Sequence, residues 1–179
     1  MAKKALMVLC LCVLVVTCAF AAGKFSMTGQ FSPFAYQNVK HTSGTYKSTY
    51  GYGFGVGFRY KAWKNVNLGL DIDMDFYNYD ELNSSYDVVS IKAVGGYTYH
   101  FGDKFFALGE LGVGVDERSI GEVDKMYFGL GVKLGAGYAV TESFKVTAGA
   151  AMDLSFQKGK STKSTDFAIR PTVGVVVTP

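Results

Sequence analysis

Residues 50–60 alternate strictly between large apolar side chains and glycines, and only Arg59 interrupts the glycine series. A period of two residues predicts a β-strand whose two faces carry different side chains. The apolar face is unsuited to water, while the glycine face has too few side chains to fill the core of a soluble protein. The segment is about as long as the ~9–11 residues that a tilted strand needs to cross a bilayer. It therefore predicts a transmembrane strand with its bulky side chains toward lipid and its glycines toward a crowded lumen.

The same alternation recurs in seven other segments. The eight predicted strands span residues 24–32, 50–60, 66–77, 88–101, 105–116, 127–138, 144–156 and 166–178. Short turns alternate with longer polar loops at 37–49, 78–87, 117–125 and 157–165, as in an inserted barrel with periplasmic turns and surface loops. After residue 21 no apolar stretch reaches the ~18 residues of a membrane helix. The sequence thus predicts an all-β fold, a transmembrane, antiparallel, up-and-down eight-stranded β-barrel.

The first residues have the pattern of a secretory signal peptide. Lys3 and Lys4 precede a short apolar stretch, and Ala19-Phe20-Ala21 supplies an A-x-A cleavage pattern. We expect a cleaved signal peptide at 1–21 and a barrel domain at 22–179. A retained anchor and a lipoprotein acylated at Cys18 are the alternatives. Every cysteine lies before the expected cut, so the mature barrel has no disulfide and no cysteine metal site.

Alternation alone does not decide which face is inside, because a soluble lipocalin-like barrel has the same period with its apolar face inward. Its wet face would then be mostly glycine on two strands, which weakens exposed strands without adding solubility. Charged residues make up 18% of the chain, below the ~25% of ordinary soluble domains. Without Lys3 and Lys4 the formal charge falls from +3 to +1, which does not suggest nucleic-acid binding. These features favour the membrane barrel.

Aromatic residues cluster near both ends of the predicted strands, as in the interfacial girdles of membrane barrels. The turn-side group is Tyr60, Trp63, Tyr99, Phe101, Phe105, Tyr138 and Phe144. The loop-side group is Phe34, Tyr36, Tyr50, Tyr77, Tyr79, Tyr86, Tyr127, Phe156 and Phe167.

The predicted inward faces carry five cationic and five anionic side chains. They are Arg59, Lys92, Lys133, Lys145, Arg170, Asp71, Asp73, Asp75, Glu110 and Asp153. The lumen of an eight-stranded barrel is just wide enough to be filled by side chains. Because an unpaired buried charge costs several kcal/mol, we expect these groups to pair across the interior. A salt-bridge plug is the structural interpretation, and a polar track or gate for a small solute is the functional one.

Motifs for catalysis, metals and cofactors are weak. Asp71, Asp73 and Asp75 follow a calcium-like spacing, but the glycine and glutamate of an EF-hand loop are missing. His41 stands near Ser43 in the first loop, yet no third group that would orient a catalytic pair can be identified. We expect no catalytic residue, no metal and no cofactor, and hence no enzyme.

The first and fourth predicted loops are basic. Their candidate binding residues are Lys40, His41, Lys47, Lys158, Lys160 and Lys163. Loops on a rigid scaffold commonly carry binding functions. These residues either bind a surface ligand or merely solvate the rim and meet anionic lipid head groups.

The chain as a whole resembles a known group of proteins. The signal peptide, the eight amphipathic strands, the one-sided tight turns and the segment Gly135–Phe144 are similar to small outer-membrane barrels of the OmpA transmembrane domain, OmpX and OmpW type. This resemblance implies a monomer in the outer membrane of a diderm bacterium, with outer-membrane lipid and the barrel-assembly machinery as partners. It implies either passage of small hydrophobic solutes past a charge-plugged lumen, or a structural or adhesin-type barrel whose loops meet lipopolysaccharide or host ligands.

Overall fold

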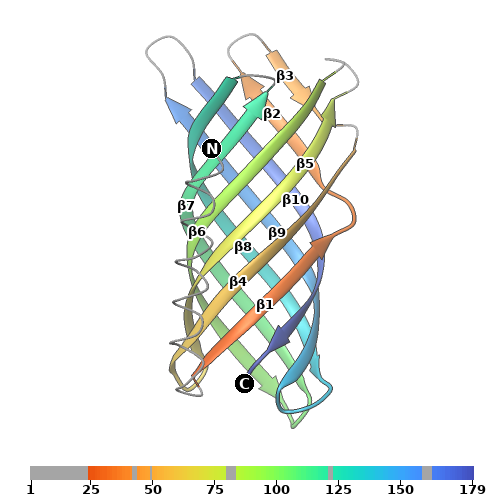
Figure 1. Ribbon diagram of the computed structural model, residues 1–179, viewed down its shortest axis with the longest axis vertical. Helices are drawn as coiled ribbons and strands as arrows, with labels where there is room; N and C mark the ends of the chain where they lie inside the picture. The colour runs from red at the N-terminus through yellow and green to blue at the C-terminus, as the bar shows by residue number, and fades with distance from the viewer. Residues whose placement is uncertain (1–23, 42–43, 49, 80–83, 121–122, 159–162) are drawn as a thin grey trace.

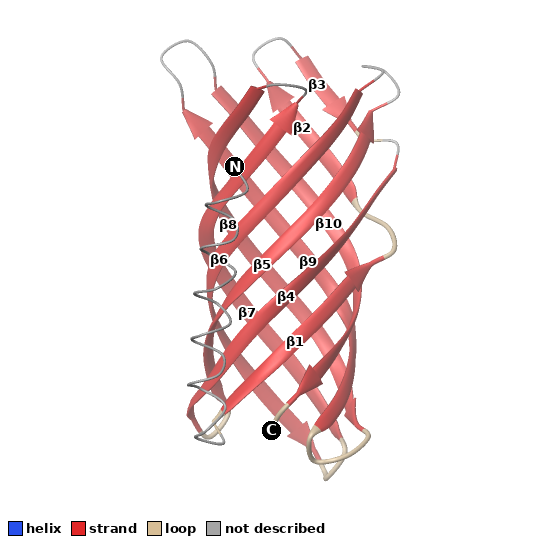
Figure 2. Ribbon diagram, in the orientation of Figure 1, coloured by secondary structure: helices blue, strands red, loops and turns tan. Residues whose placement is uncertain are grey.

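The computed structural model describes residues 24–41, 44–48, 50–79, 84–120, 123–158 and 163–179. Figure 2 shows these residues as strands joined by turns. The strands are β1 Phe25–Ser32, β2 Tyr36–His41, β3 Gly44–Lys47, β4 Tyr50–Trp63, β5 Val66–Tyr79, β6 Ser84–Phe101, β7 Phe105–Ile120, β8 Val123–Ala139, β9 Phe144–Lys158 and β10 Lys163–Val177. No helical segment within the described residues has the length and hydropathy of a membrane span.

The strands form one closed antiparallel barrel. The order is β1-β4-β5-β6-β7-β8-β9-β10, and β1 pairs with β10 to close it. β1 and β2 both pair with β10, one after the other along its length, so they share one position in the wall. β3 pairs with β2 as a hairpin at the rim. The wall therefore has eight strand positions (Figure 1). The predicted eight-stranded, up-and-down barrel is confirmed. The predicted signal peptide lies outside the described residues.

The tight turns lie at one end of the barrel, together with the C-terminus (Figure 1). In the turn between β6 and β7, Gly102 has a φ of 72°, a left-handed conformation that favours glycine. Between β8 and β9, Thr141 Oγ1 accepts a hydrogen bond from the Phe144 amide at 3.0 Å. By the usual asymmetry of such barrels, this end is periplasmic and the opposite end faces the cell surface.

The strands extend further toward the surface than the sequence pattern indicates. β6 begins at Ser84, β7 continues to Ile120, and β8 begins at Val123. The first predicted loop contains β2 and β3. These segments were expected to be loops because they are polar, but ladder hydrogen bonds hold an extended chain above the membrane as well as inside it. At 14 to 18 residues, the seven longest strands, β4 to β10, exceed the ~9–11 residues that cross a bilayer.

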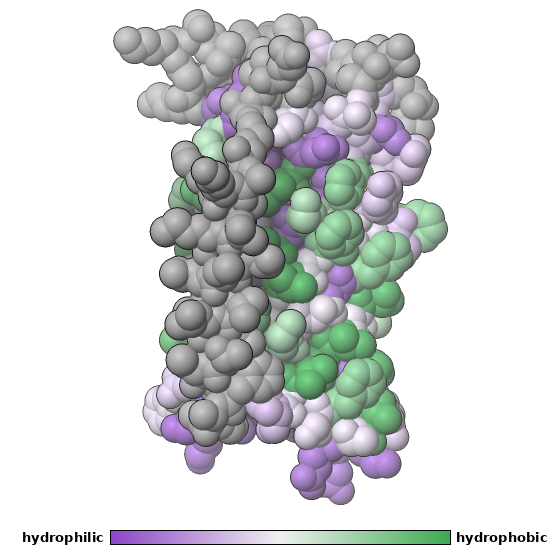
Figure 3. Space-filling view, viewed as in Figure 1, coloured by the Kyte–Doolittle hydropathy of each residue, from purple (hydrophilic) through white to green (hydrophobic). Residues whose placement is uncertain are grey.

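The inside–outside assignment is confirmed by burial. On β4, Gly51, Gly53, Gly55 and Gly57 are buried, while the tyrosines and Phe54 between them are exposed. Many large apolar side chains are exposed, and on the uncovered part of the face in Figure 3 they gather at mid-height with polar residues toward the ends. With no core on that side, these side chains require lipid as their surroundings.

The turn-side aromatic girdle is exposed as predicted except at Tyr138, which is half-buried. Tyr99 and Phe101 meet edge to face, with 4.9 Å between their ring centroids. The loop-side prediction is wrong for Tyr77, Tyr79, Tyr86 and Tyr127, which are buried inside the barrel. Tyr77 and Tyr79 share the strand face of the β5 aspartates, so they point into the lumen. Position near a strand end does not by itself place an aromatic side chain at the lipid interface.

Candidate functional site

The candidate site is the lumen, and its side chains are accommodated by glycines on neighbouring strands. In the β4–β5 ladder, Gly53, Gly55 and Gly57 pair with Asp75, Asp73 and Asp71. A Cβ atom at any of these glycines would overlap with the carboxylate of its paired aspartate. The alternation of glycine on one strand and aspartate on the next therefore leaves space for buried carboxylates along one wall.

Arg170 on β10 holds the centre of the lumen. Its guanidinium forms an ion pair with Asp75 and donates to Asp153 Oδ2 at 2.5 Å, and it lies 3.9 Å from Asp73 Oδ2. Its exposed fraction is 3%. One side chain from β10 thus links carboxylates of β5 and β9 across the barrel, and it ties opposite walls together.

Arg59 on β4 forms a second cluster nearer the periplasmic end. It donates to Asp71 through two nitrogens, at 2.6 and 2.9 Å. It also donates to Glu110 on β7 through two nitrogens, at 2.6 and 2.8 Å. The planar guanidinium suits such paired contacts with carboxylates. The Arg59 guanidinium therefore binds both carboxylates at once.

Lys92 on β6 connects the centre to the surface side. Its Nζ donates to Asp153 Oδ1 at 2.8 Å and lies 3.5 Å from Asp116 Oδ1. Asp116 also accepts hydrogen bonds from Ser90, at 2.7 Å, and from Ser155. The carboxylates in this region are bound by hydroxyl groups as well as by cations, which offsets their loss of water.

The surface-side part of the network was missed by the sequence reasoning. Arg118 on β7 forms an ion pair with Asp166 and stacks on Tyr127, with 4.0 Å between the guanidinium carbon and the ring centroid. Asp116 lies 3.9 Å from Arg118. These residues fell at or beyond the expected strand ends. The signal was available, because Asp116 and Arg118 continue the alternation of Gly112 and Gly114.

Polar and aromatic side chains close the lumen above Arg118. The Tyr79 hydroxyl donates to Gln37 Oε1 at 2.7 Å. The backbone amide of Gln37 donates to Ser48 Oγ, also at 2.7 Å. Tyr79 and Tyr86 meet edge to face with 5.9 Å between centroids. The β2–β3 hairpin is therefore packed onto the barrel interior by side chains from β2 and β5.

Little space remains between these groups. Two cavities in the network, one beside Lys92 and Asp153 and one beside Asp116 and Arg118, have volumes of about 30 and 10 Å³. A single water requires roughly 10–15 Å³ by this kind of measure. They hold a few waters at most, which is too little for a continuous aqueous path.

The periplasmic end differs from the rest of the lumen, because it contains an open cavity of about 230 Å³. We call this cavity the vestibule. Lys133 and Lys145 line it, and among the described residues neither forms an ion pair, although Lys133 lies opposite Glu110 in the ladder. Lys133 donates to Gln30, and Lys145 lies 5.7 Å from the centre of the Phe106 ring.

The basic residues predicted for the surface loops lie around one side of the barrel mouth. Lys40 and Lys47, near the tips of β2 and β3, are exposed. The β10 ladder brings His41 opposite Ser164, and Lys163 opposite Lys158. Lys160 lies outside the described residues. The backbone therefore brings the ends of β2, β9 and β10 together, so that the first and fourth connections share one side of the rim.

No group of three or more His, Asp, Glu or Cys side chains positioned to hold a metal ion occurs in the part of the chain that the structure describes. The Asp71, Asp73 and Asp75 carboxylates are engaged instead. Asp71 binds Arg59, Asp75 binds Arg170, and Asp73 Oδ1 accepts from Gln30 at 2.5 Å. Their spacing along β5 thus serves a network of ion pairs and hydrogen bonds.

Comparison with known proteins identifies the fold. The crystal structure of Neisserial surface protein A (NspA) matches with a TM-score of 0.66 and 21% identity, covering 88% of this chain and 98% of that chain. The outer membrane protease OmpT from Escherichia coli matches with a TM-score of 0.53 and 10% identity, covering 87% of this chain and 96% of that chain. At these identities the likeness shows the fold alone. No curated protein matches the sequence.

A family model decides the classification. Residues 6–172 match the model described as "Outer membrane protein beta-barrel domain". This match spans most of the chain and agrees with the closed barrel and its exposed apolar side chains. The protein belongs to the outer-membrane β-barrel family and is located in the outer membrane.

Proposed function

We propose that this protein is a closed barrel that anchors a binding surface at the outer face of the membrane, rather than a pore or an enzyme. The observation that supports this most strongly is the filled lumen. Arg59, Lys92, Arg118 and Arg170 link the walls through buried ion pairs, and the cavities of about 30 and 10 Å³ between them hold a few waters at most. A lumen built in this way contributes rigidity and leaves the strand ends as the accessible part of the molecule.

The surface-side ends supply a candidate binding surface. The strands extend beyond the length needed to span the bilayer, and the β2–β3 hairpin adds to the rim. Lys40 and Lys47 are exposed on this hairpin, beside the strand ends that carry Lys158 and Lys163. Basic side chains on a rigid support favour anionic groups. The phosphates of lipopolysaccharide, which surround the barrel mouth in an outer membrane, are the ligand that we propose.

The test compares lipopolysaccharide binding by the native protein and by a Lys40→Gln/Lys47→Gln variant in neutral detergent. Lys125→Gln is the matched control, because Lys125 also lies near the surface-side end but pairs in the ladder with Arg118 on another part of the rim. We expect the double variant to lose at least about five-fold in affinity, with the control unchanged. Equal affinity in all three proteins would reject the proposed surface.

Passage of a small hydrophobic solute is the second candidate, and one observation favours it. The barrel wall is interrupted between β1 and β2, where Phe34 is 71% exposed. On β10, the residues Arg170–Thr172 lie between the ladders to β1 and β2 and pair with neither strand. Pro171 has no amide hydrogen to donate at this place. The interruption is a weak seam in an otherwise continuous wall.

Uptake of a hydrophobic fluorescent dye into vesicles would distinguish the two candidates. The variant Pro33→Thr/Pro171→Val restores ladder hydrogen-bonding capacity at the seam. Faster uptake than in protein-free vesicles, abolished by this variant, would favour solute passage over the closed anchor. Uptake equal to that of protein-free vesicles is expected if the barrel is only an anchor.

A further inference from the structure

The vestibule at the periplasmic end has an unbalanced charge. Its lining contains six cationic side chains, Lys24, Arg59, Lys61, Lys64, Lys133 and Lys145, and one carboxylate, Glu110. Glu110 is already bound by Arg59 through both of its oxygens. Among the described residues, none of the five lysines forms an ion pair. The lining residues thus carry a formal excess of five positive charges, and four of these remain if Lys24, which points away from the cavity, is left out.

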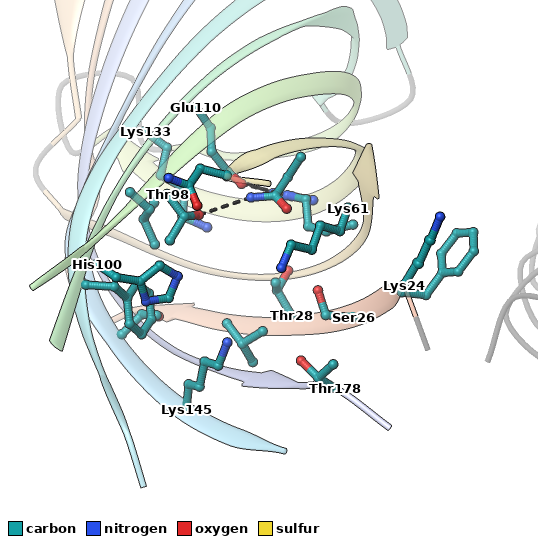
Figure 4. Close-up of a pocket in the computed structure, with 18 of the residues that line it drawn as sticks. Lys24, Ser26, Thr28, Lys61, Thr98, His100, Glu110, Lys133, Lys145 and Thr178 are labelled. Atoms are coloured by element: carbon teal, nitrogen blue, oxygen red, sulfur yellow. Dashed lines mark hydrogen bonds and ion pairs between the residues drawn. The ribbon is translucent and has the colours of Figure 1, made fainter. Parts of the chain in front are cut away.

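The lysines face a cavity rather than open solvent alone. Figure 4 shows Lys61 on β4 and Lys145 on β9 with their ammonium ends directed into the vestibule, whereas Lys24 points away. β1 and β10 lie between these two strands in the wall. Lys61 and Lys145 are near enough for their charges to interact. Lys133 lies deeper, where its ammonium group donates to Gln30. Like charges that converge on one cavity repel each other, and an anion between them would relieve that repulsion.

The rest of the lining supplies neutral hydrogen-bonding groups. Ser26, Thr28, Thr98 and Thr147 contribute hydroxyl groups, and Asn67 donates to Thr98 Oγ1 at 3.0 Å. The acidic residues of the neighbouring turns, Asp103 and Glu142, are exposed and are not part of the lining. The chemistry of the cavity is therefore that of ammonium and hydroxyl donors around a space without a free carboxylate.

The size of the cavity limits the ligand. Its volume of about 230 Å³ is below the ~300–1,000 Å³ typical of pockets for drug-sized molecules. An anion with several oxygens and more than one charge would use the converging ammonium groups best. We propose that the vestibule binds a phosphate-type anion, either a free phosphate compound or the phosphate of a lipid head group from the periplasmic leaflet. This site lies at the opposite end of the barrel from the proposed surface function and does not depend on it.

The free-phosphate arm measures binding of inorganic pyrophosphate by calorimetry, in dodecyl maltoside at constant ionic strength. The variant is Lys61→Gln/Lys145→Gln. Both side chains lie at the open end, away from the buried ion pairs, so the barrel should fold. The matched control is Lys104→Gln, since Lys104 belongs to a periplasmic turn and lies over Tyr138 instead of lining the vestibule. We expect the double variant to bind pyrophosphate at least ten-fold more weakly, with the control unchanged.

The lipid arm measures retention of phosphatidylglycerol by native mass spectrometry, after release from nanodiscs of phosphatidylcholine and phosphatidylglycerol. Retention that falls in the double variant but not in Lys104→Gln, without pyrophosphate binding, would support the site and identify a lipid phosphate as its ligand. If the vestibule lysines affect neither pyrophosphate binding nor phosphatidylglycerol retention, or if the control loses as much as the double variant, the proposal is overturned.

Discussion

Replacing Arg170 with methionine is the most informative perturbation of the lumen. Methionine fills part of the same volume without charge, so the change removes the ion pairs to Asp75 and Asp153 and the nearby positive charge at Asp73. Asp153 keeps Lys92 as a partner at 2.8 Å, and Asp73 keeps the hydrogen bond from Gln30. Asp75 has no other cation within ion-pair distance among the described residues. The variant thus leaves one fully uncompensated buried carboxylate.

Removing one partner of a buried pair commonly costs ~3–5 kcal/mol, because the other charge stays buried without compensation. We expect Arg170→Met to lose free energy of unfolding in this range, which is more than a hundred-fold in the folding equilibrium. The assay is reversible urea unfolding in phosphatidylcholine vesicles, followed by tryptophan fluorescence from Trp63. The double variant Arg170→Met/Asp75→Asn should recover a large part of the loss. Equal stability of native protein and Arg170→Met, or no recovery in the double variant, would refute the reasoning.

Three further outcomes are expected from other parts of the chain. Leu130→Arg, on the lipid face near the middle of β8, should cost ~2–4 kcal/mol in vesicles because it places a charge in the bilayer core, and an unchanged unfolding curve would reverse the inside–outside assignment. Gly114→Ala should cost ~1–3 kcal/mol, because its Cβ would overlap with the Ile91 carbonyl oxygen. Gly95→Ala is its control, since that Cβ would meet only Leu68 Cδ2 at 3.7 Å. Intact mass spectrometry of outer-membrane fractions should give a mature chain that begins at Ala22, and an acylated or uncut chain would contradict this.

The architecture could be predicted from the sequence because one physical signal, the period of two, carries it. On β4 the alternation of glycine and aromatic residues determines which face meets lipid, and burial agrees at Gly51, Gly53 and Gly55. A shift of β4 by one residue would turn every glycine toward lipid and every aromatic residue toward the lumen. The pattern therefore allows only one assignment of the two faces. Eight such segments with alternating connection lengths then lead to a closed barrel.

The height of each side chain along the barrel axis could not be predicted in the same way. Alternation places Lys133 and Lys145 on the inner face, but it does not show that both reach the vestibule at the periplasmic end. That position depends on strand tilt and on the register between strands. Arg118 and Asp166 were missed for the converse reason, because the network continues into strand segments that the polar composition had marked as loops.

The interruption between β1 and β2 shows a third limit. The first predicted strand ends at residue 32, but the pattern did not show that the chain would return to the same line and form β2 along β10. That arrangement depends on contacts between residues distant in sequence, such as the hydrogen bond from Tyr79 to Gln37. The local propensities of a sequence do not predict contacts between distant residues. The turn at Gly102 needs no distant partner, and the sequence pattern predicted it.

Single-channel recording of the native protein in planar bilayers shows whether side chains close the lumen. We predict no steady current at moderate voltage, because Arg59, Lys92, Arg118 and Arg170 are paired across the interior and the cavities between them hold only a few waters. A large, steady, ion-selective conductance from the unmodified protein would contradict the closed lumen and place the chain among pore-forming barrels.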